Sequence, residues 1–136
     1  MELLKRYKRD TGRTEQGFKF VLGKDAYIRI ARMHDSNPQF KAATDALVRQ
    51  RQHELDNLKG RNKNEAYADI AEAAFGQVCI TEIVGVTLGD DVITADAIGI
   101  ARIKIEVPEL WQELMTAAID ASNYIGEFDE ENSLKN

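Results

Sequence analysis

Residues 17–31 read GFKFVLGKDAYIRIA and alternate between the two faces of an extended chain. Phe18 and Phe20 come before the turn-forming Gly23-Lys24-Asp25, and Ile28 and Ile30 follow it. A period of two, interrupted by Gly and Asp, is typical of two antiparallel strands joined by a turn. This stretch therefore predicts a β-hairpin, which must pack on helices or pair with another copy, because two strands alone are only marginally stable.

Helical spacing dominates the chain between residues 37 and 125. Asn37 is a suitable N-cap, and Pro38 fits the first helical position, where its missing N–H costs nothing. About four helices are expected from such starts and from apolar residues three and four positions apart. They run from Pro38 to near Gly60, from Asn62 or Asn64 through Thr81, from an N-cap at Thr94 to Ile105, and from Val107-Pro108 to Ile125. The predicted fold class is mainly α (α+β), with an N-terminal β-hairpin followed by a bundle of about four helices.

The second and fourth expected helices carry the most complete apolar stripes. Ile70 and Val78 recur at helical spacing in the second helix, and Trp111 and Leu114 do so in the fourth. We expect these four residues in the core, with packing favoured over an interface role for Trp111. Cys79, among apolar neighbours, is expected to be a small buried side chain.

Two shorter features lie between these helices. Val86 and Leu88 are expected to be extended between Gly85 and the turn Gly89-Asp90-Asp91. After them, the third expected helix should line one face with apolar residues three and four positions apart. These residues are Ile98, Ala101 and Ile105.

The two ends of the chain lack such stripes. We expect residues 1–16 to form a basic, flexible arm or a short frayed helix without core residues. Residues 126–136 are expected to form a loose acidic tail, in which Phe128 either folds back onto the protein or anchors a partner. With the hairpin at 17–31 and helices at 37–125, residues 1–136 should make a single domain, as the length of 136 residues allows.

Charge is distributed unevenly along the chain. Residues 1–63 contain 15 Lys and Arg against 8 Asp and Glu, whereas residues 64–136 contain 3 against 15, which gives net charges of +7 and −12. The basic half keeps open the alternative of a small regulatory or nucleic-acid-binding module. The larger acidic charge opposes nucleic-acid binding, however, because it repels phosphate. The split favours head-to-tail homo-oligomers or docking on a charged partner instead.

The sequence contains no recognisable pattern for catalysis or for metal or cofactor binding. His34 and His53 lack a nearby nucleophile, and there is no CxxC, HExxH, calcium-loop or phosphate-loop pattern. We therefore expect a protein that is not an enzyme and needs no cofactor. Charged residues interrupt every apolar run, so no membrane association is expected, and the lone Cys79 agrees with a reducing cytosol.

The order of the motifs resembles a known family. The closing helix begins with Pro108-Glu109-Leu110 and ends with Ser122-Asn123-Tyr124, then acidic residues follow, and Lys135-Asn136 finishes the chain. Earlier, Ile28-Arg29-Ile30-Ala31-Arg32 precedes Asn37-Pro38-Gln39-Phe40. This arrangement is similar to that of the tail assembly chaperones of long-tailed, siphovirus-type bacteriophages. The chain departs from that pattern in having Tyr124 where Phe is usual and Ile83-Val84-Gly85 where Trp-Gly is frequent.

The resemblance implies a protein of the host cytoplasm that is not part of the mature virion. Such chaperones bind the tape measure protein, keep it soluble and help to recruit tail tube subunits during tail morphogenesis. They often occur beside a longer, frameshifted form of themselves, which would be a further partner. The candidate partner-binding residues are Arg29, Arg32, Tyr124 and Phe128.

Overall fold

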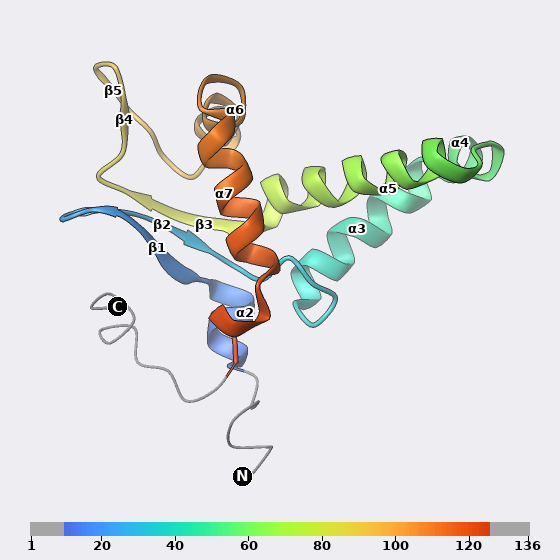
Figure 1. Cartoon of the computed structure of the whole chain (residues 1–136), viewed down its shortest axis with the longest axis horizontal. Helices are drawn as coiled ribbons and strands as arrows, with labels where there is room; N and C mark the ends of the chain where they lie inside the picture. Colours follow the sequence, from blue (N-terminus) through green and yellow to red (C-terminus); the bar gives the residue numbers. More distant parts are fainter. Residues whose placement is uncertain (1–9, 126–136) are drawn as a thin grey trace, which may run out of the picture.

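The computed structural model describes residues 10–125, where a three-stranded sheet and six α-helices surround two apolar cores (Figure 1). This mixture of helix and sheet agrees with the predicted α+β class. The expected count of about four helices is wrong, because one expected helix is divided and an additional short helix precedes the hairpin. The helices do not form one bundle either, because α3, α4 and most of α5 project away from α6 and α7, which contact α5 near its C-terminal end at Glu72.

The predicted hairpin is confirmed. Strand β1 covers Phe18–Gly23 and strand β2 covers Ala26–Ile30, with Phe18 opposite Ile30. Because successive side chains point to opposite faces, Ile28 and Ile30 share the covered face of the sheet, and both are fully buried.

A third strand, β3 (Ile80–Val84), pairs antiparallel with β2 and completes the order β1-β2-β3. The prediction of a helix continuing through Thr81 is therefore wrong. Helix α5 (Gly60–Ala74) passes into a π-helical turn at Phe75–Cys79, and the chain then extends into β3. The physical reason is that the N–H and C=O groups along the second edge of β2 need hydrogen-bond partners, which β3 provides. This pairing also buries Ile80.

Helices α3 (Pro38–Gln50), α4 (Gln52–Asn57) and α5 form an arm that points away from the sheet (Figure 1). The predicted start is confirmed, because the side chain of Asn37 accepts a hydrogen bond from the Gln39 N–H at 3.2 Å. The single helix expected as far as Gly60 is divided at Arg51. This division allows α4 to bury Leu55 against α5 in a small core of the arm's own. That core comprises Leu55, Ala66 and Ile70, with Leu47, Val48 and Leu58 at its margin.

The chain between the arm and the last helices forms a second, smaller hairpin. Strands β4 (Thr87–Leu88) and β5 (Asp91–Val92) pair antiparallel around Gly89. Helix α6 (Ala97–Glu106) follows, and its N-cap is Asp96 rather than the expected Thr94. Asp96 Oδ1 accepts from the Gly99 N–H at 2.8 Å, while the Thr94 hydroxyl donates to the same carboxylate and orients it.

The closing segment is shorter than the expected helix to Ile125. Helix α7 covers Pro108–Ile119, and a 3-10 turn at Ala121–Asn123 follows it. Asp120 separates the two because its side chain accepts a hydrogen bond from the Ser122 N–H at 3.0 Å and caps the new turn.

The expectation that residues 1–16 form an arm without core residues needs correction. Thr11–Gln16 form helix α2, whose N-cap Asp10 accepts from the Arg13 N–H. Arg13 and Thr14 are buried, with 5% and 1% of their surfaces exposed. The reason is tertiary, because the Asp10 N–H donates to the Tyr124 carbonyl at 2.9 Å and ties α2 to the chain's last described residues. The expectations for residues 1–9 and for the acidic tail with Phe128 lie outside the described residues.

Candidate functional site

The expected core residues occupy the interior. Leu114 is fully buried, Trp111 and Ile70 are each 3% exposed, and Val78 is half-buried at the margin of the main core. Trp111 packs edge to face on Phe75 with ring centroids 5.1 Å apart, and its Nε1–H donates to Glu72 at 2.8 Å. Trp111 therefore holds α7 against α5 and the π-turn.

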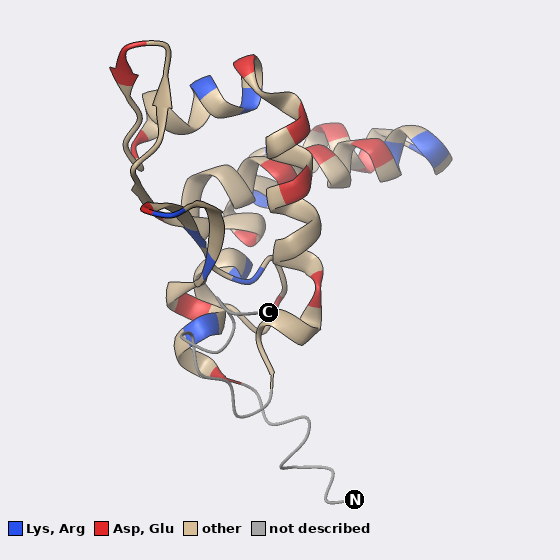
Figure 2. Cartoon of the chain, turned by 60° about the vertical axis from the view of Figure 1, so that its left-hand side comes forward, with Lys and Arg blue, Asp and Glu red and all other residues tan. Residues whose placement is uncertain are grey.

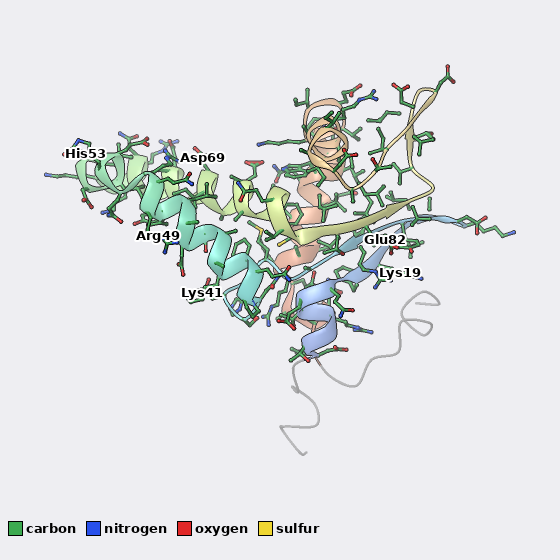
Figure 3. All side chains as sticks on the ribbon, turned by 180° about the vertical axis from the view of Figure 1, so that it is seen from behind. Lys19, Lys41, Arg49, His53, Asp69 and Glu82 are labelled. Carbon is green, nitrogen blue, oxygen red and sulfur yellow. The ribbon has the colours of Figure 1, made fainter. Side chains whose placement is uncertain are left out.

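Reactive side chains do not converge in the described part of the chain. Cys79 is fully buried, and burial raises the pKa of its thiol to about 12, so the thiol stays protonated near neutral pH. His53 lies on the arm, far from the sheet (Figure 3), and His34 contacts Ser36 instead. Among residues 10–125, no group of three or more His, Cys, Asp or Glu is arranged to hold a metal ion.

Tyr124, a candidate partner-binding residue, is a core residue instead. It is fully buried, its hydroxyl donates to the Ile30 carbonyl at 3.0 Å, and its ring packs edge to face on Phe18 at 5.3 Å. Burial is the main cause that raises the pKa of its hydroxyl. Tyr124 therefore joins the end of the chain to the sheet and is not available for direct contact with a partner.

Arg29 and Arg32, the candidates near the hairpin, make contacts within the chain. Arg29 Nε lies 3.3 Å from Glu82 Oε1, and its guanidinium also donates to the Gly17 carbonyl. Arg32 donates to Ser36 and lies 6.0 Å from the centre of the Tyr124 ring. The structure thus brings Arg32 and Tyr124 together, but it places Arg29 on the uncovered face of the sheet. Phe128 lies outside the described residues.

The uncovered face of the sheet carries a row of three side chains. Val21, Tyr27 and Val84 are aligned across the three strands by their register, and Val21 is half exposed. Lys19 and Glu82 lie on the same face (Figure 3). Lys19 Nζ is 4.6 Å from the centre of the Tyr27 ring, whose hydroxyl donates to Glu82 at 2.8 Å. Hydrogen bonds from Tyr27 and then Arg29 lower the pKa of Glu82. Much of this face is therefore already occupied by contacts within the chain.

A more exposed apolar surface lies on α6. Ile98 and Ile105 are 76% and 77% exposed, and Ala101 between them is also exposed. These residues share one face, as expected, and that face points to solvent. We call Ile98, Ala101 and Ile105 the α6 surface. Val92 of the neighbouring hairpin is 73% exposed, and Arg102 ties that hairpin to α6 through Asp91 at 2.9 Å.

Close packing on the other side of α6 determines which of its faces is exposed. A Cβ on Gly99 would lie only 2.0 Å from the Thr94 carbonyl oxygen, so the backbone of Gly99 faces the hairpin connection. Ile103 on the covered side is 1% exposed. Sequence reasoning could not choose between these faces, because isoleucines occur at 98, 100, 103 and 105 and surround the helix. That distribution gives no signal of exposure, because a helix with apolar residues on all its sides is usually buried.

A hollow of about 440 Å³ adjoins the α6 surface, between α6 and the junction of α5 with the π-turn. Ala101 belongs to both features, while Gly76 and Trp111 line the hollow on the opposite side. Lys104 and Glu72 also line it, with 3.9 Å between the ammonium and the carboxylate. The two features together form a mainly apolar surface with a few charges around it, which is the usual composition of a protein-binding region.

No protein-family model, curated protein or solved structure matches this chain. In addition, no helix within residues 10–125 has the length and hydropathy required to cross a membrane. The motifs of the sequence and the surfaces described above therefore carry the evidence on function.

Proposed function

We propose that the protein is a tail assembly chaperone of a long-tailed bacteriophage. In this role it binds the tape measure protein in the host cytoplasm, keeps it soluble, helps to recruit tail tube subunits and is absent from the mature virion. The order of the sequence motifs supports this family. The observation that carries the binding role is the α6 surface, where two isoleucines are about three-quarters exposed.

The chemistry of the α6 surface suits a helical client. Ile98 and Ile105 are seven positions apart, so they lie two turns apart on one side of α6. An amphipathic client helix can cover both at once, and fully burying an isoleucine side chain contributes roughly 1.5–3 kcal/mol. One such contact is weak, but many copies along a long client act together through multivalency. A longer, frameshifted form of the protein would carry the same surface.

Coexpression with the tape measure protein of the same tail gene cluster tests this proposal. We expect the native chain to move the client from the pellet to the soluble fraction. The variant Ile98→Ser/Ile105→Ser should lose this effect while keeping its circular dichroism spectrum. A matched control, Val21→Ser, removes an exposed apolar side chain from the sheet and should behave like the native chain. If the client stays insoluble with the native chain, the proposal is wrong. If it is equally soluble with all three chains, the α6 surface is not the client contact.

Phe128 is the other candidate client contact. Removal of residues 127–136 tests it in the same coexpression assay, where a lower soluble fraction of client would assign the contact to this segment. Unchanged solubilisation would leave the α6 surface as the contact.

The alternative is a regulatory or nucleic-acid-binding module that uses the basic N-terminal half. A salt-dependent electrophoretic shift of DNA or RNA, together with an insoluble client, would favour that alternative.

A further inference from the structure

The hollow beside α6 is a preformed, mainly apolar cavity. Its floor includes Trp111 and Ile80, which are 3% and 6% exposed and belong to the main core. A Cβ on Gly76 would lie 3.4 Å from the Trp111 ring, so the hollow extends to this ring because residue 76 has no side chain. The volume of about 440 Å³ is within the range of roughly 300–1,000 Å³ that is usual for ligand pockets. The hollow can therefore receive a large side chain without rearrangement of the core.

Exposed alanines border the hollow on two helices. Ala73 belongs to α5, whereas Ala97 and Ala101 lie one turn apart on α6. Because these side chains are short, the backbone of an incoming helix can approach α6 closely. Ala101 also belongs to the α6 surface, so the hollow and that surface are continuous. One helix lying along α6 can therefore cover the exposed isoleucines and place a side chain in the hollow at the same time.

Asp96 supplies a fixed negative charge at one end of the hollow. It lines the hollow and caps the start of α6. Its carboxylate accepts hydrogen bonds from the Thr94 hydroxyl and from the Gly99 N–H. These bonds, of which the one from Thr94 has the larger effect, lower the pKa of Asp96. The carboxylate is therefore ionised near neutral pH and is held in one orientation.

Lys104 supplies the opposite charge at the other end of the hollow. It lies eight positions after Asp96, about 12 Å farther along the axis of α6. Its side chain is half exposed and its ammonium lies 3.9 Å from the Glu72 carboxylate, so N–H donors remain for a second carboxylate. Figure 2 shows the Lys and Arg of α6 in the C-terminal half of this helix. The hollow is thus flanked by a negative and a positive charge.

We infer that the hollow holds one large aliphatic or aromatic side chain of the client helix, and that Asp96 and Lys104 set the direction of that helix. The client segment carries a Lys or Arg near Asp96 and an Asp or Glu near Lys104, about two turns apart, with the large side chain between them. A single anchor in a well-packed pocket often dominates the affinity of an interface, and charge complementarity selects its orientation. This inference rests on the proposed function and adds to it the chemistry of the client segment.

Filling the hollow tests the anchor. The probes are overlapping synthetic peptides that cover the tape measure protein of the same tail gene cluster, and fluorescence anisotropy measures their binding to the full chain. Ala73→Leu and Ala97→Leu fill the hollow from α5 and from α6, and each should weaken binding about tenfold or more. Ala68→Leu, at an exposed alanine of α5 that does not line the hollow, is the matched control and should bind like the native chain.

The peptide supplies the second half of this test. Replacing its largest apolar residue by Ala should weaken binding to the native chain, but should cause little further loss with Ala73→Leu, because the same contact is already removed. Native affinity in both filled variants, with unchanged circular dichroism spectra, would overturn the inference. If the native chain binds no peptide and leaves the client insoluble on coexpression, the proposed function fails with it. Binding that is insensitive to filling overturns the anchor alone.

Thiol protection locates the bound peptide directly. Cys79 is fully buried, so it gives little background in labelling with iodoacetamide. The peptide should slow labelling of the thiol introduced by Ala73→Cys several-fold and leave the thiol introduced by Ala68→Cys unaffected. Equal labelling rates at position 73 with and without peptide would contradict the inference. Protection at position 73 that appears when the protein concentration alone is raised would assign the hollow to a second copy and would also contradict it.

Neutral variants test the direction of the client helix. Asp96→Asn keeps a good N-cap but removes the charge, and Lys104→Gln removes the ammonium. Each should weaken peptide binding about two- to fivefold in low salt, and the loss should disappear near 1 M salt, where the Debye length is roughly 3 Å. Lys24→Gln, at an exposed position on the β1–β2 turn, is the control. Native affinity in both Asp96→Asn and Lys104→Gln at low salt would overturn the assigned direction.

Discussion

The arm (α3, α4 and α5) differs from the body, by which we mean the three-stranded sheet with α2, α6 and α7, in how far apart in the sequence the buried contacts lie. In the body, the Tyr124 hydroxyl bonds to the Ile30 carbonyl across 94 positions, and α2 is tied to the same end of the chain. In the arm, the small core uses Leu55, Ala66 and Ile70, which lie close together in the sequence. The body therefore requires both ends of the described chain to meet, whereas the arm depends on local pairing of helices.

The largest effect should come from the centre of the body. Trp111→Ala removes the contact with Phe75 and the hydrogen bond to Glu72, and should cost about 3–5 kcal/mol of unfolding free energy, enough to unfold a marginally stable domain. Urea denaturation followed by circular dichroism measures this. Trp111→Phe is the matched control and should recover part of the loss. A loss below about 1 kcal/mol for Trp111→Ala would show that α7 is not essential to the body.

A smaller, local effect is expected in the arm. Leu55→Ala should cost about 2–3 kcal/mol and should raise hydrogen exchange in α4 and the start of α5 while leaving β1 and β2 protected. Hydrogen exchange read out residue by residue measures this. The exposed Ala68→Ser on α5 serves as a control with little expected change. Equal loss of protection in the arm and the sheet would contradict the division into two regions.

Alkaline pH should weaken the body through Cys79. Its pKa is raised by burial from 9.0 to about 12, so the folded state favours the neutral thiol. The stability linked to this group is fully present below pH 9 and is lost as pH rises toward 12, by about 1.4 kcal/mol for each pH unit between the two pKa values. Denaturation midpoints from pH 8 to 11 measure this, with Cys79→Ala as the variant that lacks this component. Identical pH dependence of both proteins would contradict the assignment.

The smallest of these effects concerns the link between the end of the chain and the sheet. Tyr124→Phe keeps the ring on Phe18 but removes the hydrogen bond to the Ile30 carbonyl, at a cost of about 1 kcal/mol. Thermal unfolding should show a slightly lower midpoint. Tyr67→Phe, at an exposed position on α5, is the control. An unchanged midpoint for Tyr124→Phe would mean that the ring alone provides the link.

Several parts of this protein were determined by local sequence. The hairpin follows from alternation and from the turn at Gly23-Lys24-Asp25, and the start of α3 follows from Asn37 and Pro38. The closing helix follows from the stripe that includes Trp111 and Leu114. In each case the deciding interactions lie within a few residues along the chain, so periodicity and capping rules detect them.

Only the tertiary structure decided the features on which the candidate surfaces depend. Residues 80–84 became a strand because β2 offered an edge, and Tyr124 became buried because Phe18 and Ile30 lay opposite it. The backbone of Gly99 packs closely against Thr94, and this contact turns the opposite face of α6 toward solvent. The physical reason is the same in all three cases. A residue's burial is determined by surfaces far away in the sequence, and a local pattern that suits two environments cannot select between them.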